Sequence, residues 1–220
     1  MTFNAVIFDM DGVLVDSIPL YLKAEQIAFR EHGVEMDARE QYERVGQPEI
    51  ELCKYFVRKH GVPKPPEEMS RLVEEKLFEL LETDGMPRVP HAVELLTALR
   101  EKEVPMAVAS SSVERVVNHF LKAAELRRFF SVFVTISEIP RGKPFPDLFL
   151  KAAEYLRVPP SKCVVVEDAL HGVEAARNAG MYCIGLKNPL SGQQNLDGAN
   201  VVVNDLKEAR HHLNQLMAKE

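Results

Sequence analysis

Short apolar runs that end in polar side chains recur along the chain. The clearest runs predict strands at Ala5–Asp9, Met106–Ser110 and Cys163–Asp168. Less regular runs predict further strands at 132–136, 183–186 and 201–203. Continuous apolar runs of this length are typical of strands buried on both faces, as in a parallel sheet.

From about residue 88 onward, these runs alternate with stretches whose apolar residues recur at helical spacing. The four stripes are Ala92, Leu95, Leu96 and Leu99; Val113, Val116, Val117 and Leu121; Leu148, Ala152, Tyr155 and Leu156; and Val173, Ala176 and Ala179. Alternation of strand and helix predicts βαβ units. The sequence therefore predicts an α/β fold with a doubly wound, Rossmann-like parallel sheet.

The stretch between residues 17 and 85 interrupts this alternation. Helical stripes begin near Leu20, Ile50 and Met69, and they end at Gly33, Gly61 and Gly85. No convincing strand pattern lies among them. We predict a helical domain at 17–85, inserted into an α/β core domain made of 1–16 and 86–220.

Polar side chains that can take part in catalysis or ligand binding follow three of the predicted strands. The first strand ends in Asp9 and Asp11, the second in Ser110–Ser112, and a later one in Glu167 and Asp168. Lys143 lies in a loop before a predicted helix. Ligands of open α/β sheets bind at the carboxyl ends of the strands, so these groups are expected to meet there.

The two acidic pairs predict a metal site. Because side chains alternate along a strand, Asp9 and Asp11 would share one face if the strand persisted. Four carboxylates held together would repel one another, and a hard divalent cation relieves that conflict. Oxygen ligands favour Mg²⁺. Solvated turn acids are the alternative for either pair taken alone.

The serines and the lysine suit an anion. Backbone N–H groups and a hydroxyl at a helix N-terminus form a phosphate site, for which Ser110 is the best candidate. Helix capping is an equal alternative for Ser111 and Ser112. Lys143 could be an ordinary surface lysine. Its place at the head of a helix favours a second interpretation, in which its ammonium offsets negative charge on a nucleophile and on a phosphoryl group.

Together these groups match the demands of phosphate-ester hydrolysis, which needs rate enhancements of up to ~10²¹-fold. Electrostatic stabilisation and positioning supply most of that factor. A carboxylate nucleophile divides the reaction into two steps through an aspartyl phosphate. A second carboxyl can act as general acid and then as general base.

The sequence Asp9-Met10-Asp11-Gly12-Val13, with Ser110, Lys143 and Glu167-Asp168, resembles the four motifs of the haloacid dehalogenase superfamily in order. The helical insertion resembles the cap of subfamily I. The resemblance implies that Asp9 is the nucleophile and a magnesium ligand. It implies that Asp11 is the general acid/base, with its backbone carbonyl on the metal.

The resemblance also assigns the remaining motif residues. Ser110 and Lys143 would bind the phosphoryl group, with Ser111 beside them, and Lys143 would steady the nucleophile. Asp168 would be a metal ligand, with Glu167 next to it. The implied activity is a magnesium-dependent phosphatase that hydrolyses a small phosphorylated metabolite, such as a sugar phosphate.

Two alternatives stay open. The resemblance extends to β-phosphoglucomutase, but Tyr21, Glu49 and Glu114 replace residues characteristic of the mutase, and a glutamate facing a phosphate would be repulsive. A phosphorylation-switched receiver domain is the second alternative, although such domains are shorter and lack a helical insertion.

Residues of the predicted cap are candidate substrate contacts, with solvated cap surface as an equal alternative. These residues are Tyr21, Arg44, Gln47, Glu49 and Lys76.

Charge and cysteine content narrow the classes of partner and location. The net charge of −6 argues against nucleic acid and anionic membranes as partners. Asp9 and Asp11 would interrupt a signal peptide, and no apolar run is long enough to cross a bilayer, so a cytoplasmic protein is expected. Three separated cysteines predict reduced thiols. We expect a monomer or a weak homodimer.

Overall fold

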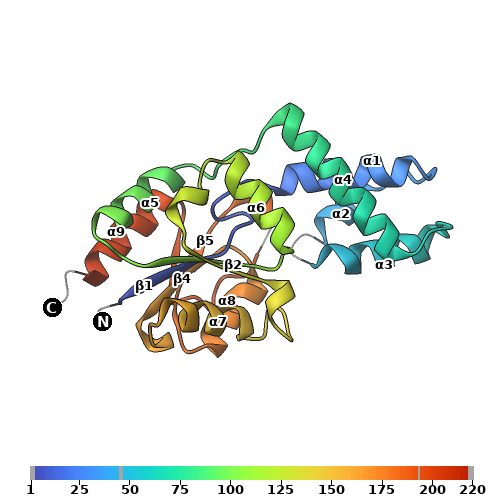
Figure 1. The fold of residues 1–220 in the computed structure, drawn as a ribbon. Helices are drawn as coiled ribbons and strands as arrows, with labels where there is room; N and C mark the ends of the chain where they lie inside the picture. Colours follow the sequence, from blue (N-terminus) through green and yellow to red (C-terminus); the bar gives the residue numbers. More distant parts are fainter. Residues whose placement is uncertain (1–2, 45–46, 193, 218–220) are drawn as a thin grey trace. The chain divides into compact units, whose positions relative to one another are not determined.

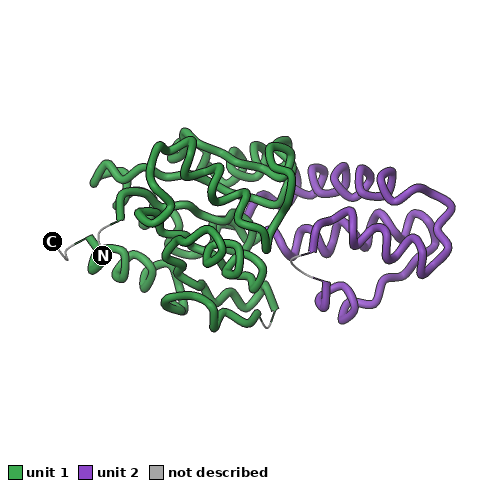
Figure 2. The backbone as a smooth tube through the Cα atoms, turned by 90° about the horizontal axis from the view of Figure 1, so that it is seen from below, with its two compact units in different colours: residues 1–16, 87–220 green, residues 17–86 purple. Residues whose placement is uncertain are grey.

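The computed structural model describes residues 3–44, 47–192 and 194–217. It divides the chain into two compact units, residues 1–16 with 87–220 and residues 17–86 (Figure 2). The second division falls after Met86, one residue beyond the predicted boundary.

The first unit is built around a six-stranded parallel sheet in the order β3-β2-β1-β4-β5-β6. Its strands are β1 Ala5–Phe8, β2 Met106–Ser110, β3 Val132–Thr135, β4 Cys163–Glu167, β5 Tyr182–Leu186 and β6 Val201–Val203. The predicted doubly wound α/β sheet is confirmed. The chain runs from β1 outward to β3 and then crosses to β4 on the other side of β1, so the order reverses between β1 and β4.

Helices cover both faces of this sheet. They are α5 Ala92–Glu101, α6 Glu114–Ala123, α7 Asp147–Leu156, α8 Leu170–Asn178 and α9 Leu206–Met217. Helices α7 and α8 lie on one face, and α5, α6 and α9 lie on the other (Figure 1). Both faces of the central strands are therefore buried, which is why their sequences are continuously apolar.

The core shows how strand register places the helices. Ile7 of β1 lies beside Ala107 of β2 and Val165 of β4 in the sheet. These three side chains belong to one fully buried cluster with Phe149 of α7 and Val173 of α8. Because alternate strand residues point to the same face, this register also aligns the carboxyl ends of the three strands.

The second unit consists of helices α1 Ile18–Arg30, α2 Ala38–Tyr42, α3 Glu49–His60 and α4 Pro66–Asp84. Helix α4 packs against both α1 and α3. Its buried residues, Met69, Val73, Leu77 and Leu80, recur every three or four positions. The short α2 was not predicted because its five residues carry no apolar stripe; its N-cap Asp37 accepts a hydrogen bond from the Glu40 backbone N–H.

The three cysteines are free and buried, as predicted. Over the described residues, no helix combines the length and the apolar character that a membrane crossing requires.

Candidate active site

Three strand ends bring the candidate residues together at the reversal of strand order. Strand β1 stops at Phe8, so Asp9 is the first residue beyond it, and its backbone N–H still donates to the Val166 carbonyl of β4. Glu167 is the last residue of β4, and Asp168 follows it. Asp9, Glu167 and Asp168 are 6%, 1% and 4% exposed, so this acidic trio is buried.

The acidic trio has the spacing of a metal site. One carboxylate oxygen from each of the three residues lies within 4.8 Å of the others. The trio carries three negative charges when ionised, and the contacting Lys143 supplies one positive charge. A divalent cation would balance the remainder, and an all-oxygen ligand set suits Mg²⁺. The residues present therefore fit the predicted ion.

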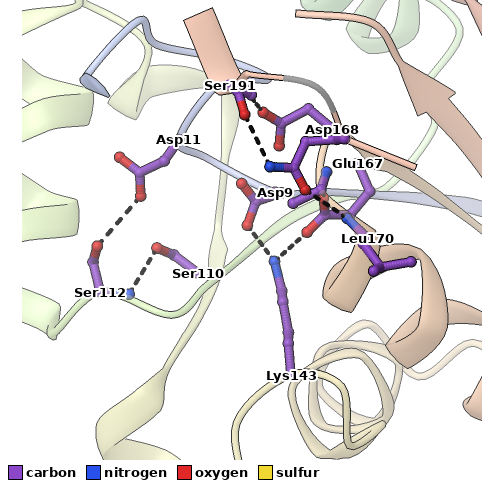
Figure 3. A network of polar contacts seen from close by, with 11 residues as sticks. Asp9, Asp11, Ser110, Ser112, Lys143, Glu167, Asp168, Leu170 and Ser191 are labelled. Atoms are coloured by element: carbon purple, nitrogen blue, oxygen red, sulfur yellow. Dashed lines mark hydrogen bonds and ion pairs between the residues drawn. The ribbon is translucent and has the colours of Figure 1, made fainter. Parts of the chain in front are cut away.

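Lys143 joins two members of the trio (Figure 3). Its ammonium donates to Asp9 Oδ1 and, at 2.5 Å, to Glu167 Oε1. The side chain of Lys143 is only 9% exposed, so the alternative of a surface lysine is wrong. The other oxygen of Glu167 accepts from the Ala169 backbone N–H at 2.7 Å, which fixes the orientation of this carboxylate.

Burial governs the protonation of these groups. Burial raises the pKa of Asp9 to about 8, Lys143 opposes this effect, and the charges of Glu167 and Asp11 add to it. Burial, followed by the charges of Glu167 and Asp9, raises the pKa of Asp168 well above its ordinary value. Burial alone would lower the pKa of Lys143, but the Asp9 and Glu167 carboxylates outweigh it and raise that pKa. The lysine is therefore charged.

Asp11 does not join the acidic trio, which corrects the expectation that four carboxylates converge. Strand β1 ends before it, and the chain turns at Gly12, whose φ is +79°. Ser112 donates its hydroxyl to Asp11 Oδ2 at 3.3 Å (Figure 3). The carboxyl of Asp11 thus lies toward the serine loop.

The serine loop differs from the predicted helix start. Ser110 is the last residue of β2 and is fully buried, and its Oγ accepts from the Ser112 backbone N–H at 3.1 Å. Helix α6 begins only at Glu114 and has Val113 as its N-cap, so Ser111 and Ser112 lie before the assigned cap position. Ser111 is exposed in the turn between β2 and α6.

The candidate substrate contacts of the helical unit have varied surroundings. Lys76 forms ion pairs with Glu31 at 3.0 Å and with Glu79 at 3.3 Å. The Arg44 guanidinium lies 3.3 Å from the centre of the Tyr55 ring. Gln47 is exposed, and Tyr21 is half-buried on α1.

Glu49 is the exception among these candidates, because it takes part in a buried polar cluster. Its Oε1 accepts from the Cys53 thiol at 3.2 Å, and its carboxyl is in hydrogen-bonding contact with Glu25. Burial raises the pKa of Glu49 to about 7. Neither Glu25 nor its partner Gln41 was among the predicted residues.

Sequence reasoning also missed a loop that contacts the acidic trio. Ser191 is 3% exposed and donates its hydroxyl to Asp168 Oδ2. Asn188 donates from Nδ2 to the Gly12 carbonyl at 2.8 Å. No motif marks these two residues in the sequence; the one signal is their position just after β5, at the same edge of the sheet as Asp168.

Comparison with known proteins gives a consistent result. The family model of the haloacid dehalogenase-like hydrolases matches residues 6–186. The phosphorylated carbohydrates phosphatase of Thermotoga maritima is 33% identical over 178 residues, which cover 81% of this chain and 82% of the relative. The protein SUPPRESSOR OF QUENCHING 1 of Arabidopsis thaliana, a chloroplastic protein, is 38% identical over 86% of this chain, but the match spans only 18% of that relative.

A solved structure with the same fold is CbbY from Rhodobacter sphaeroides in complex with phosphate. Its TM-score with this chain is 0.86 at 25% identity, and the superposition covers 94% of this chain and 96% of that one.

Proposed function

Because the chain belongs to the haloacid dehalogenase-like hydrolases, we propose that it is a magnesium-dependent phosphatase acting on a small phosphorylated metabolite through an aspartyl phosphate at Asp9. The observation that carries the proposal is the buried acidic trio with Lys143 between two of its members. The relative named as a phosphorylated carbohydrates phosphatase supports a sugar phosphate as substrate.

Asp9 is assigned as the nucleophile because its buried carboxylate is paired with the Lys143 ammonium. Its Oδ1 accepts from Lys143, which leaves Oδ2 for attack on phosphorus. Attack forms an Asp9–phosphorus bond as the bond from phosphorus to the leaving alcohol breaks. Lys143 also offsets negative charge on the phosphoryl oxygens while the phosphoryl group is transferred to Asp9.

Asp11 is assigned as the general acid/base. Its carboxyl stands apart from the trio and is oriented by Ser112. It donates a proton to the leaving alcohol and then takes a proton from the water that attacks the phosphorylated Asp9. Ser110 and the backbone of its loop would hold the phosphoryl oxygens.

Asp9, Asp168 and the carbonyl of Asp11 would hold Mg²⁺, with Glu167 nearby. When bound, the ion supplies Lewis-acid stabilisation of charge on the phosphoryl group. We further propose that residues 17–86 form a cap domain that carries substrate specificity. Location in the cytoplasm and a monomeric or weakly dimeric state stay predictions of the sequence.

The test of this function is phosphate release from a panel of phosphorylated metabolites in the presence and absence of Mg²⁺. Asp9→Asn removes the nucleophile, so turnover is expected to fall by at least ~10³-fold. Asp197→Asn, at an exposed position, is the matched control and should keep wild-type turnover. Wild-type turnover in Asp9→Asn would contradict the nucleophile assignment.

The same panel separates the phosphatase from the mutase. Glucose phosphate is assayed with a bisphosphate activator, and both isomerised product and free phosphate are measured. Net phosphate release is expected. Efficient interconversion without release would instead assign the chain to the phosphohexomutases.

A further inference from the structure

The loop after β5 buries a serine hydroxyl against the acidic trio. This loop contains a short 3₁₀ turn, Pro189–Ser191. Ser191 is 3% exposed, and its hydroxyl donates to Asp168 Oδ2 (Figure 3). A loop serine would ordinarily be solvated, so its burial on a carboxylate calls for a physical reason.

One end of the turn is fixed to the chain that follows β1. Asn188 Oδ1 accepts from the Leu190 backbone N–H at 2.8 Å, which closes the turn. Asn188 Nδ2 donates to the Gly12 carbonyl at 2.8 Å and to Asp16 Oδ1 at 3.1 Å. The turn is therefore tied to the segment that carries Asp9 and Asp11, and not only to its own strand.

The other end is fixed to the start of α8. Gln194 Nε2 donates to the Ser191 carbonyl at 2.9 Å, and Gln194 Oε1 accepts from the Leu170 backbone N–H at 3.2 Å. Leu170 is the first residue of α8, two positions after Asp168. Both the backbone and the side chain of Ser191 are thus held relative to Asp168.

Gly12 completes the confinement of Asp168. A Cβ atom at Gly12 would lie 2.0 Å from Asp168 Oδ2 and 2.8 Å from Ser191 Oγ. Asp168 and Ser191 therefore pack directly against the backbone at Gly12. This packing leaves the carboxylate of Asp168 little room to rotate.

We propose that Ser191 is a positioning residue that orients Asp168 for the divalent cation and so sets the affinity of the site for the metal. The inference rests on the proposed function, because that function places a cation on Asp168. With Oδ2 held by Ser191, Oδ1 is the oxygen left for the ion. Mg²⁺ demands near-octahedral geometry, so a carboxylate that is already oriented binds it at lower cost. Hydrogen-bonding partners of metal ligands typically contribute ~10–100-fold to affinity.

Metal binding without substrate tests the inference directly. Mn²⁺, which takes the same oxygen ligands, is titrated into the metal-free protein while electron paramagnetic resonance measures the free ion. Ser191→Ala is expected to raise the Kd for Mn²⁺ by ~10-fold or more. The control Thr135→Val removes another buried hydroxyl of the same unit, one that donates to Glu138, and should leave the Kd unchanged.

Kinetics distinguish positioning from a general loss of structure. In Ser191→Ala, the Mg²⁺ concentration for half-maximal phosphate release should rise by the same factor as the Kd, whereas kcat at saturating Mg²⁺ should change less. Gln194→Ala loosens Ser191 from its backbone side and should weaken Mn²⁺ binding in the same direction. Far-UV circular dichroism verifies folding, and Gln194→Ala decides the test if Ser191→Ala does not fold.

A wild-type Kd for Mn²⁺ in the folded variants would overturn the inference, as would equal weakening in Thr135→Val. Failure of the proposed function has a different signature: the wild-type protein would release no phosphate, or Asp9→Asn would release it at the wild-type rate. The Mn²⁺ comparison between Ser191→Ala and wild type does not depend on that outcome.

Discussion

In the helical unit, the carboxyl groups of Glu25 and Glu49 are in hydrogen-bonding contact, which requires a proton on one of them. The substitution Glu25→Gln tests whether this proton is present. Glu25 is 4% exposed on α1, and its Oε2 accepts from Gln41 Nε2 at 2.6 Å. Its carboxyl is also in hydrogen-bonding contact with Glu49. Two ionised carboxylates can only accept, so this contact requires a proton on one of them. Burial, and then the charge of Glu49, raise the pKa of Glu25 to about 9.

Among the described residues, none supplies a positive charge that opposes the rise in the pKa of Glu25. Gln41, on α2, contributes an amide, and its Oε1 is taken by Gln26 of α1 at 2.9 Å. From α3 come Glu49 and the Cys53 thiol, whose pKa is raised by burial first and then by Glu49. Protonation is therefore the way in which this cluster avoids a buried charge.

The magnitude follows from proton linkage. The folded pKa of Glu25 lies above the ordinary value of 4.5, so its stabilising effect is complete below pH 4.5 and is lost as the pH rises toward 9. Each pH unit in this window lowers the free energy of unfolding by ~1.4 kcal/mol. The accumulated loss is ~3 kcal/mol at pH 7 and less than ~1 kcal/mol at pH 5. Glutamine has the shape of the protonated acid: its oxygen can accept from Gln41, and its amide can donate to Glu49.

The assay is urea denaturation of wild type and Glu25→Gln at pH 5 and pH 7. Circular dichroism follows unfolding, because the chain has no tryptophan. Hydrogen exchange of the α1 and α3 amides assigns the change to the helical unit. From pH 5 to pH 7, the free energy of unfolding of the variant should rise relative to that of wild type by ~2 kcal/mol or more. Glu35→Gln, at a side chain that is 75% exposed, is the control and should show no such gain.

A constant difference between Glu25→Gln and wild type at both pH values would refute the reasoning, because it would mean that Glu25 is not protonated in the folded state. Lower stability of the variant at pH 7 would refute it as well, since the amide would then have failed to replace the shared proton.

Two glycine substitutions are expected to damage the site for steric reasons. Helix propensity alone predicts that Gly172→Ala stabilises α8 by ~1 kcal/mol. The added Cβ would lie 1.8 Å from Glu167 Oε1, so phosphate release should fall by ~10²-fold or more and Tm should not rise. Gly12→Ala should weaken Mn²⁺ binding and turnover, because its Cβ would lie 2.0 Å from Asp168 Oδ2. The control Gly180→Ala also has positive φ, +69°, but nothing lies within 4 Å of its Cβ; it should lose only the ~1–2 kcal/mol of backbone strain and keep full activity. Normal metal binding in Gly12→Ala would contradict the collision argument.

The sheet could be predicted because burial on both faces leaves a direct mark on the sequence. The run Cys163–Glu167 is apolar until its last residue, and the structure buries all five of its residues. A parallel sheet aligns the carboxyl ends of its strands, so the sequence alone places Asp9, Ser110 and Glu167 at one edge.

The position of Asp11 could not be predicted from strand periodicity. Side-chain alternation would place Asp11 on the same face as Asp9 only if the strand persisted beyond Asp9. The strand instead ends at Phe8, and Gly12 at positive φ turns the chain, so the two aspartates diverge. Both neighbours continue past the partners of Phe8, β2 to Ser110 and β4 to Glu167, so the end of β1 is set by the turn at Gly12 and not by the loss of a neighbouring strand.

Glu25 shows a different limit of periodicity. The apolar stripe of α1 includes Ala24 and Ala28, and a glutamate beside this stripe is expected to be solvated. Gln41 makes its burial possible, and Gln41 belongs to α2, a helix too short to leave a stripe. A buried polar residue is thus predictable only together with its partner.

The same reasoning explains why the loop after β5 carried no signal although it touches the acidic trio. Asn188, Ser191 and Gln194 are residues that any solvated turn uses, and each acts here through a hydrogen bond to a segment distant in the sequence. The reactive groups of this site are encoded locally, at the strand ends, because their chemistry requires particular residue types. Their orientation is encoded by contacts whose residue types are common, so it emerges only when the strands are brought together. Variants of the reactive groups should therefore abolish turnover, whereas variants of the orienting loop should change metal affinity more than kcat.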